Sequence, residues 1–151
     1  MTKPLMVHVI TNFAGVGGAE MMLARLIQCT EQQYKHVIIA LMKTSEVYQS
    51  TLDRCQAHYA LDWNGINTLG TVSKLRTLLK KLQPATVQCW MYHANVLTSL
   101  SIIGLAQKPK VVWGIHHSLA SPKDESISTK IALGLSKILS QQASAIIYCA
   151  H

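Results

Sequence analysis

Short apolar runs alternate with amphipathic stretches along this chain, and the alternation limits the folds that are open to it. The apolar runs occupy residues 6–10, 36–42, 57–61, 85–91, 110–115 and 145–149. Each has the length of a buried strand. Apolar residues at helical spacing lie between them, at 19–27, 72–82, 96–106 and 131–139. Strands that alternate with helices favour an α/β fold: Rossmann-like and doubly wound, with a mainly parallel sheet and helices on both faces.

Within this pattern, some helix positions are predicted individually. The first helix should cover the sheet with a stripe of Ala19, Met22, Leu23, Leu26 and Ile27, and the last helix places Ile131, Leu135, Ile138 and Leu139 on one face. Asn95 is predicted as the N-cap of the helix at 96–106, because its side chain can accept a hydrogen bond from the first turn.

Composition favours a single globular domain over residues 1–151. The chain is 49% hydrophobic and 14% charged, which suits buried strands rather than disorder. The apolar stretch 96–106 is too short to span a bilayer, and the N-terminus lacks the features of a signal peptide. The cysteines at 29, 55, 89 and 149 form no C-x-x-C pair and are expected to be buried free thiols. We therefore expect a cytoplasmic protein.

Gly17 and Gly18 stand between the first apolar run and a helix that opens at Ala19 and Glu20. Glycine allows a positive φ and leaves room for a ligand, and the unpaired N–H groups of a helix start attract anions. The alternative is a tight turn that binds nothing. Glu20 stands where a G-x-G-x-x-G fingerprint from Gly15 needs its third glycine, and no Gly-Lys-Ser/Thr sequence occurs. Conventional NAD and ATP sites are therefore disfavoured.

Polar residues gather where the strands end, which is where parallel sheets bind ligands. Tyr92-His93-Ala94-Asn95 follows the fourth run and His116-His117-Ser118 follows the fifth. Imidazoles can donate to phosphate or hydroxyl oxygens and titrate near neutral pH. Each of these histidines could instead be a loop residue bonded to backbone. His8 and His36, which lie within or at the start of strands, are expected to be structural.

Other kinds of site find less support. Cys89, His93, His116 and His117 share no ordered metal-ligand spacing, so no metal is expected. The aspartates stand at no clear strand end, and neither a serine triad nor a glycosidase carboxylate pair can be assembled. The edge therefore looks built to bind something polar or anionic.

The formal net charge of +7 admits nucleic acid, an anionic membrane surface or phosphorylated ligands. The basic residues are scattered in sequence, and Lys80-Lys81 is the only adjacent pair. No recognition helix or stacking-aromatic motif accompanies them, so nucleic acid is disfavoured. Peripheral contact with the inner face of a membrane stays open.

The motifs together resemble the N-terminal domain of family 4 retaining glycosyltransferases, which have the two-domain GT-B architecture. The resemblance covers essentially the whole chain. It is carried by three segments: Val7-His8-Val9-Ile10 with Gly17-Gly18-Ala19-Glu20, then Trp90-Met91-Tyr92-His93-Ala94-Asn95, then Trp113-Gly114-Ile115-His116-His117-Ser118.

This resemblance implies transfer of a sugar from a nucleotide-sugar donor to a glycan or lipid-linked acceptor, without a metal or other cofactor. His116 and His117 would be catalytic. The donor or acceptor would be bound by Gly17, Gly18, Glu20, His93, Asn95 and Ser118. A C-terminal domain with a glutamate pair would hold the donor nucleotide, and because that domain is absent from this chain, residues 1–151 should not turn over alone.

Two alternatives remain at this point. The same α/β core could be a non-catalytic module that binds an anionic ligand or a partner protein. It could also be a small enzyme acting on phosphorylated metabolites, which would have to bind phosphate by itself.

Overall fold

A computed structural model describes residues 2–115 and 127–148 and shows one parallel sheet. The strands are β1 (Leu5–Ile10), β2 (Lys35–Ala40), β3 (Ala57–Ala60), β4 (Thr86–Trp90), β5 (Lys110–Ile115) and β6 (Ala145–Tyr148). Their order is β3-β2-β1-β4-β5-β6, and every neighbouring pair is parallel. The predicted strands and the Rossmann-like α/β fold are confirmed.

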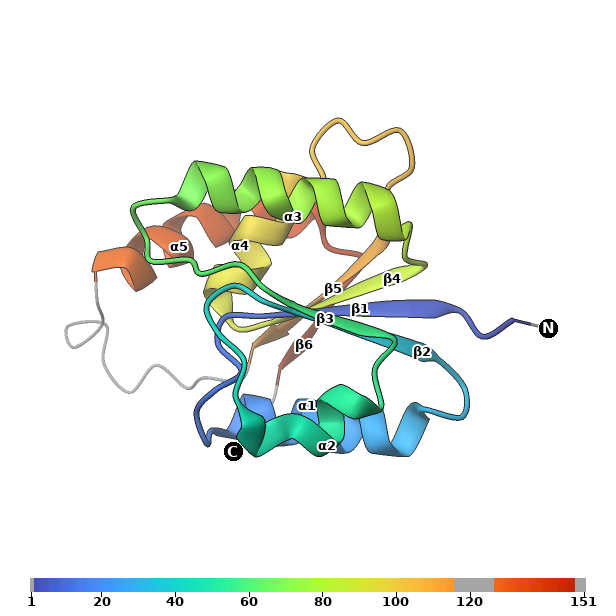
Figure 1. Cartoon of the computed structure of the whole chain (residues 1–151). Coiled ribbons are helices and arrows are strands. Elements are labelled where there is room, and N and C mark those ends of the chain that lie inside the picture. Colours follow the sequence, from blue (N-terminus) through green and yellow to red (C-terminus); the bar gives the residue numbers. More distant parts are fainter. Residues whose placement is uncertain (1, 116–126, 149–151) are drawn as a thin grey trace.

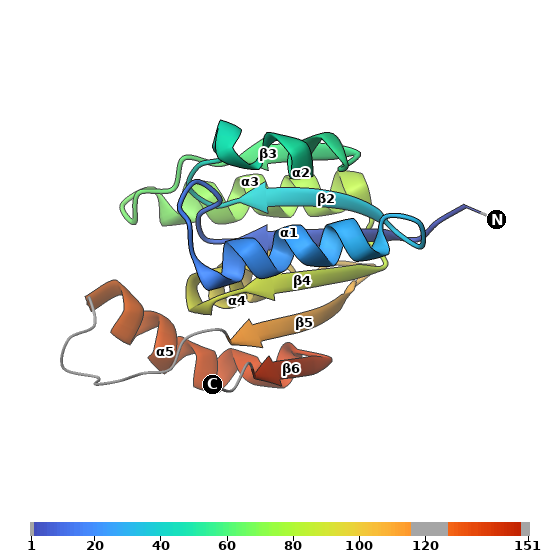
Figure 2. The same ribbon diagram turned by 90° about the horizontal axis from the view of Figure 1, so that it is seen from below.

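Helices cover both faces of the sheet (Figure 1). One face carries α1 (Gly18–Thr30), the 3₁₀ turn η1 (Glu46–Tyr48) and α2 (Gln49–Asp53). The other carries α3 (Thr68–Leu82), α4 (Tyr92–Ser101) and α5 (Ile127–Leu139), followed by the 3₁₀ turn η2 (Ser140–Gln142). We call these the α1 layer and the α3 layer. Viewed from the α1 side, α4 lies between α3 and α5 (Figure 2).

The core has two halves because successive strand residues point to opposite faces. Val7, Val9 and Trp113 pack under the α3 layer, whereas Ile10 and Trp90 pack under the α1 layer. Where helix and sheet meet, the burial of about 25 cal/mol per Å² of apolar surface favours the fold.

Helix faces agree with the sequence patterns only in part. In α1, Ala19, Leu23 and Ile27 are buried, whereas Met22 is 46% exposed and Leu26 is half-buried. The stripe is therefore narrower than predicted. In α5, Leu139 is buried but Ile131, Leu135 and Ile138 are exposed. No helix among the described residues is long and apolar enough to cross a membrane.

The prediction that Asn95 caps a helix at 96–106 is wrong. Helix α4 begins at Tyr92 and ends at Ser101, so Asn95 lies inside its first turn. Met91 is the N-cap residue, with φ 76° and ψ 165°, and its carbonyl accepts from the Asn95 amide at 3.0 Å. A non-glycine residue at positive φ turns the chain from strand to helix within one position. No capping signature marks this start.

The cysteines differ in burial. Cys89 is buried, Cys55 is half-buried and Cys29 is exposed, so the expectation of uniformly buried thiols is wrong for Cys29. Cys149 lies outside the described residues. Desolvation by burial raises the pKa of both Cys55 and Cys89 to about 12, so both are neutral thiols at physiological pH.

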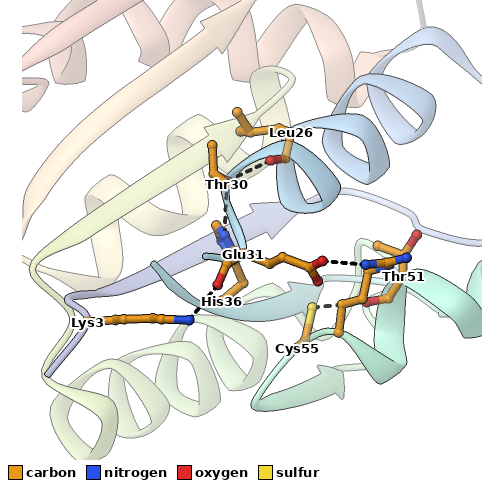
Figure 3. Close-up of polar contacts among 8 residues, drawn as sticks. Lys3, Leu26, Thr30, Glu31, His36, Thr51 and Cys55 are labelled. Carbon is orange, nitrogen blue, oxygen red and sulfur yellow. Dashed lines mark hydrogen bonds and ion pairs between the residues drawn. The ribbon is translucent and has the colours of Figure 1, made fainter. Parts of the chain in front are cut away.

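A directed chain of hydrogen bonds crosses the core under α1. Trp90 Nε1 donates to His8 Nδ1 at 3.3 Å, and His8 Nε2 lies 3.0 Å from His36 Nδ1. His36 Nε2 lies 3.1 Å from Thr30 Oγ1, whose proton goes to the Leu26 carbonyl at 2.6 Å (Figure 3).

The hydrogen bonds at the two ends of this series fix the same tautomer for His8 and for His36. An indole N–H only donates, so His8 Nδ1 must accept; Thr30 has already given its single proton to Leu26, so it must accept from His36 Nε2. His8 and His36 therefore both carry the proton on Nε2 and are both neutral. Their predicted structural role is confirmed, since both rings are buried.

Candidate functional site

Two of the segments that carry predicted site residues lie at one edge of the sheet: the glycine loop, residues 11–17 between β1 and α1, and the start of α4. Strand β1 pairs with β4, with Ile10 opposite Trp90, and β4 pairs with β5, with Trp90 opposite Gly114. The glycine loop and the segment that begins at Met91 therefore leave neighbouring strands at the same end. This is the edge at which open parallel sheets bind ligands.

Residues that follow β2 hold the glycine loop in place. The Phe13 amide donates to the Lys43 carbonyl at 2.9 Å, and the Phe13 ring stacks on Tyr48 with centroids 4.2 Å apart. The Tyr48 hydroxyl donates to the Gly15 carbonyl at 2.8 Å. The loop is thus fixed by the fold and does not depend on a ligand to shape it.

The backbone angle at Gly17 is one that any residue can adopt. Gly17 is the N-cap of α1 with φ −129°, an extended conformation, so the expected positive φ is wrong there. A Cβ on Gly17 would collide with the Glu20 carboxylate, whereas a Cβ on Gly18 would meet nothing within 4 Å. Gly18 therefore borders open space, as a backbone that admits a ligand must.

Glu20 folds back over the start of its own helix. It occupies the third helical position, from which a carboxylate can reach the N-cap backbone. Its negative charge also acts on Tyr48: burial, and then the Glu20 charge, raise the pKa of the Tyr48 hydroxyl. The positive end of α1 thus faces a carboxylate of this chain, and a ligand that approaches there meets an acceptor of hydrogen bonds as well as N–H donors.

An aromatic pair stands at the same edge, and the sequence patterns did not single out one of its members. The Trp63 ring, from the loop after β3, lies 5.1 Å from the His93 ring in the first turn of α4, at an interplanar angle of 50°. Trp63 Nε1 donates to Thr68 Oγ1 at 3.0 Å, which anchors the indole. The signal was available, since Trp63 closely follows a parallel strand and the strand-end rule applies to it.

The loop that presents Trp63 is rigidly bonded. Asn64 Oδ1 accepts from the Ile66 and Asn67 amides at 3.0 and 3.1 Å, and Asn67 Nδ2 donates to the Asp62 carbonyl at 3.1 Å. Asp62 and Gly65 take positive φ angles of 54° and 89°. The chain thus holds Trp63 on a preformed support.

Asn95 is fully buried next to this edge, and neither of its amide atoms has a hydrogen-bond partner within the part of the chain that the structure describes. An unpaired buried amide costs free energy, about 1–3 kcal/mol for each lost partner group. Such a residue needs an explanation, and a ligand-related role is one.

Several predicted residues cannot be placed. His116, His117 and Ser118 lie outside the described residues, which resume at Ile127. Strand β5 ends at Ile115. Within 2–115 and 127–148, no group of three or more His, Cys, Asp or Glu residues could hold a metal. Cys89 is a neutral thiol in the core.

The described edge therefore combines four kinds of group: a fixed loop with open space at Gly18, the Glu20 carboxylate, the Trp63–His93 ring pair, and the buried Asn95 amide. Carboxylates accept from hydroxyl groups, and aromatic faces pack against apolar ring faces. The set suits a ligand with many hydroxyl groups.

Comparison with known proteins finds a matching family model and solved structures that share the fold. A family model described as Glycosyltransferase Family 4 matches residues 16–151. A search of curated protein sequences found no match.

Solved structures share the fold at low sequence identity. HepE of Anabaena, in complex with UDP, superposes with a TM-score of 0.65 at 14% identity over 96% of this chain and 37% of its own. The lipopolysaccharide outer core galactosyltransferase WaaB gives 0.69 at 12% identity over 94% of this chain and 38% of its own. MurG of Acinetobacter baumannii gives 0.62 at 16% identity over 98% and 42%. The chain spans less than half the length of each of these proteins.

Proposed function

The chain belongs to glycosyltransferase family 4, and on that premise we propose that it is the acceptor-side domain of an enzyme that transfers a sugar from a nucleotide-sugar donor. The acceptor in this proposal is a glycan or a lipid-linked sugar. One observation carries it: the open glycine loop, the Glu20 carboxylate and the Trp63–His93 pair meet at a single edge of the sheet.

Glu20 and Trp63 suit the acceptor. A half-buried indole offers a flat face to a sugar ring, and a carboxylate accepts from two neighbouring hydroxyl groups. His93 lies against that indole and can donate to or accept from the same ligand. We assign these three side chains to positioning the acceptor hydroxyl group, which removes orientational freedom before the reaction.

The donor diphosphate would meet the open side of the loop at Gly18. Backbone N–H groups at the start of α1 can stabilise a leaving diphosphate electrostatically, so no metal or other cofactor is required in this proposal. Glu20 limits how deeply an anion can enter, so the remaining cationic groups would come from a C-terminal, donor-binding domain. His116 and His117 keep their predicted catalytic role, and Ser118 its binding role. HepE, whose structure was solved with UDP, supports a uridine nucleotide among the donors to be tested.

Nucleotide release tests this proposal with the protein in its natural length. UDP-, GDP- and ADP-sugars are offered with and without oligosaccharide acceptors. We expect one donor class to be turned over, and residues 1–151 alone to release no nucleotide. Protein-observed NMR on residues 1–151 should still show shifts at Gly18, Trp63 and His93 when the acceptor is added.

His58 supplies a matched control, since it is exposed on β3 away from the proposed site. Trp63→Leu should raise the KM for the acceptor at least tenfold and leave the KM for the donor near its starting value, whereas His58→Ala should change neither. Turnover of no donor, with no acceptor shifts at the edge, would favour a non-catalytic binding module instead.

A further inference from the structure

The edge of the sheet that holds the candidate site is acidic, although the protein as a whole is basic. Four segments leave β1, β2, β3 and β4 at this edge: residues 11–20, 41–48, 61–67 and 91–95. They contain three acidic residues and one basic residue: Glu20, Glu46, Asp62 and Lys43. The formal net charge of the chain is +7. A ligand at this edge therefore meets the opposite charge from the one that dominates the rest of the molecule.

Glu20 is held against the glycine loop without a counter-charge. Its half-buried carboxylate lies beside Gly17. Burial, and then the Glu20 charge, raise the pKa of the Tyr48 hydroxyl, which donates to the Gly15 carbonyl at 2.8 Å. Within 2–115 and 127–148 the Glu20 carboxylate forms no hydrogen bond or ion pair. A partly desolvated charge without a partner is unfavourable, so this position suits a ligand that supplies the opposite charge.

The basic residues of the described chain do not supply that charge. Lys43 is exposed and forms no ion pair with a described carboxylate. The single ion pair among the described residues joins Arg54 to Glu31, which follows the last residue of α1 and so lies at the far end of that helix from Glu20. The Glu20 carboxylate is thus left to the ligand.

We propose that Glu20 determines the specificity of the site, and that it selects an acceptor sugar with a protonated amino group. This inference rests on the proposed function, because it names the class of acceptor that the same edge would bind. A hydrogen bond between an ammonium group and a carboxylate is roughly twice as strong as one between neutral groups. A hydroxyl group can also donate to Glu20, but it leaves the carboxylate charge uncompensated.

The groups around Trp63 favour the same class of ligand. The indole face attracts a cation, and its position is fixed by the hydrogen bond to Thr68. Asp62, the preceding residue, is exposed, and its carboxylate has no partner among the described residues. Neighbouring strands lie about 4.8 Å apart, so the ends of β3, β2, β1 and β4 span about 15 Å, which a short oligosaccharide can bridge. Both halves of the edge therefore favour a cationic ligand.

The same charges disfavour an acidic acceptor. A uronic acid or a phosphorylated sugar would place a negative charge near Glu20 and Asp62, and like charges repel at such distances. The acidic edge also agrees with the proposal that a second domain supplies the cations for the donor diphosphate.

Calorimetric binding of matched saccharides tests the inference with the protein in its natural length. The probes are short oligosaccharides that differ only in the terminal residue: glucosamine, N-acetylglucosamine, glucose or glucuronic acid. N-acetylation removes the charge but keeps an N–H donor, so it isolates the effect of the charge. We expect the glucosamine probe to bind about fivefold more tightly than the acetylated probe, or more, the factor expected for one pair of unit charges in contact with water. The preference should disappear at a pH at which the sugar amine is neutral.

Matched variants assign this preference to one residue. Glu20→Gln keeps the size and the hydrogen-bonding capacity of the side chain, and it should narrow the preference to about twofold or less, because an amide does not distinguish the two probes by charge. Glu31→Gln removes the same charge at the other end of α1 and should leave the preference unchanged. Circular dichroism confirms that each variant is folded, and the comparison of probes on the unmutated protein needs no variant.

Different failures have different meanings. Equal binding of the amino and acetylated probes, or tighter binding of the glucuronic acid probe, would overturn this inference and leave the proposed sugar transfer standing. A preference for the amine that survives Glu20→Gln and is lost with Glu31→Gln would also overturn it, since the charge would act from elsewhere. Binding of no saccharide, with no nucleotide release from any donor, would overturn the proposed function together with this inference.

Discussion

Acid should destabilise this fold through the histidine chain under α1, at a pH where carboxylates still carry their charge. Burial, and then the neighbouring His36, lower the pKa of His8 to about 3 from its usual 6.5. The His36 pKa is lowered by burial, against smaller opposing effects of Thr30 and Glu31. As the pH falls below 6.5, these two histidines bind protons more readily in the unfolded chain than in the folded one. The free energy of unfolding therefore falls as the pH falls.

The size of the effect follows from the His8 pKa alone. Each unit between the folded and unfolded pKa corresponds to about 1.4 kcal/mol, so lowering the pH from 7.5 to 5 should remove about 2 kcal/mol of unfolding free energy. His36 adds to this in the same direction. The folded structure has no acceptor for a second proton on His8. A proton on Nδ1 would point at the Trp90 N–H, which is itself a donor.

Urea unfolding of this chain at a series of pH values measures the slope. His8→Gln keeps an acceptor for Trp90 and a donor for His36 but does not titrate, so the fall between pH 7.5 and 5 should shrink by about 2 kcal/mol. His58→Gln, at an exposed histidine, should leave the slope unchanged. A flat pH dependence in the unmutated chain, or a slope that follows His58 instead of His8, would refute the argument.

Three further changes have expected outcomes. Gly18→Val should lower the affinity for a ligand at the site edge at least tenfold while changing the thermal midpoint by a few degrees at most, since its side chain meets open space; a large loss of stability would make the glycine purely structural. Asn95→Leu should raise the unfolding free energy by about 1–3 kcal/mol in urea, because it removes an unpaired buried amide; a loss would show that the amide is satisfied. Leu23→Ala should cost about 2–5 kcal/mol and Leu26→Ala clearly less, since Leu23 is fully buried and Leu26 only in part.

Local patterns were sufficient for the strands and for the first helix. The apolar runs bounded by polar residues coincide with β1 to β6, and the stripe at Ala19, Leu23 and Ile27 is the buried face of α1. These features depend on side-chain periodicity within a few residues, which the sequence displays directly. The short helix α2 lacks such a period, and the polar stretch that contains it gave no helix signal.

Features that depend on register or on unusual backbone angles could not be predicted. His8 and Trp90 are 82 residues apart, and their hydrogen bond exists because β1 and β4 pair with Ile10 opposite Trp90. No local pattern fixes that register. The start of α4 depends on Met91 at φ 76°, a conformation that methionine rarely adopts. The Trp63–His93 contact likewise joins a loop and the first turn of α4, which are thirty residues apart in the sequence.

The abrupt turn at Met91 connects the buried end of β4 directly to the start of α4, without a flexible loop between them. Trp90, pinned by His8, ends one element, and His93 belongs to the first turn of the next, with only Met91 and Tyr92 between them. His93, whose ring contacts Trp63, is therefore joined by a short segment to Trp90, whose indole is buried between the sheet and the α1 layer. A displacement of the buried Trp90 ring cannot be absorbed by a flexible linker and should therefore also displace the His93 ring.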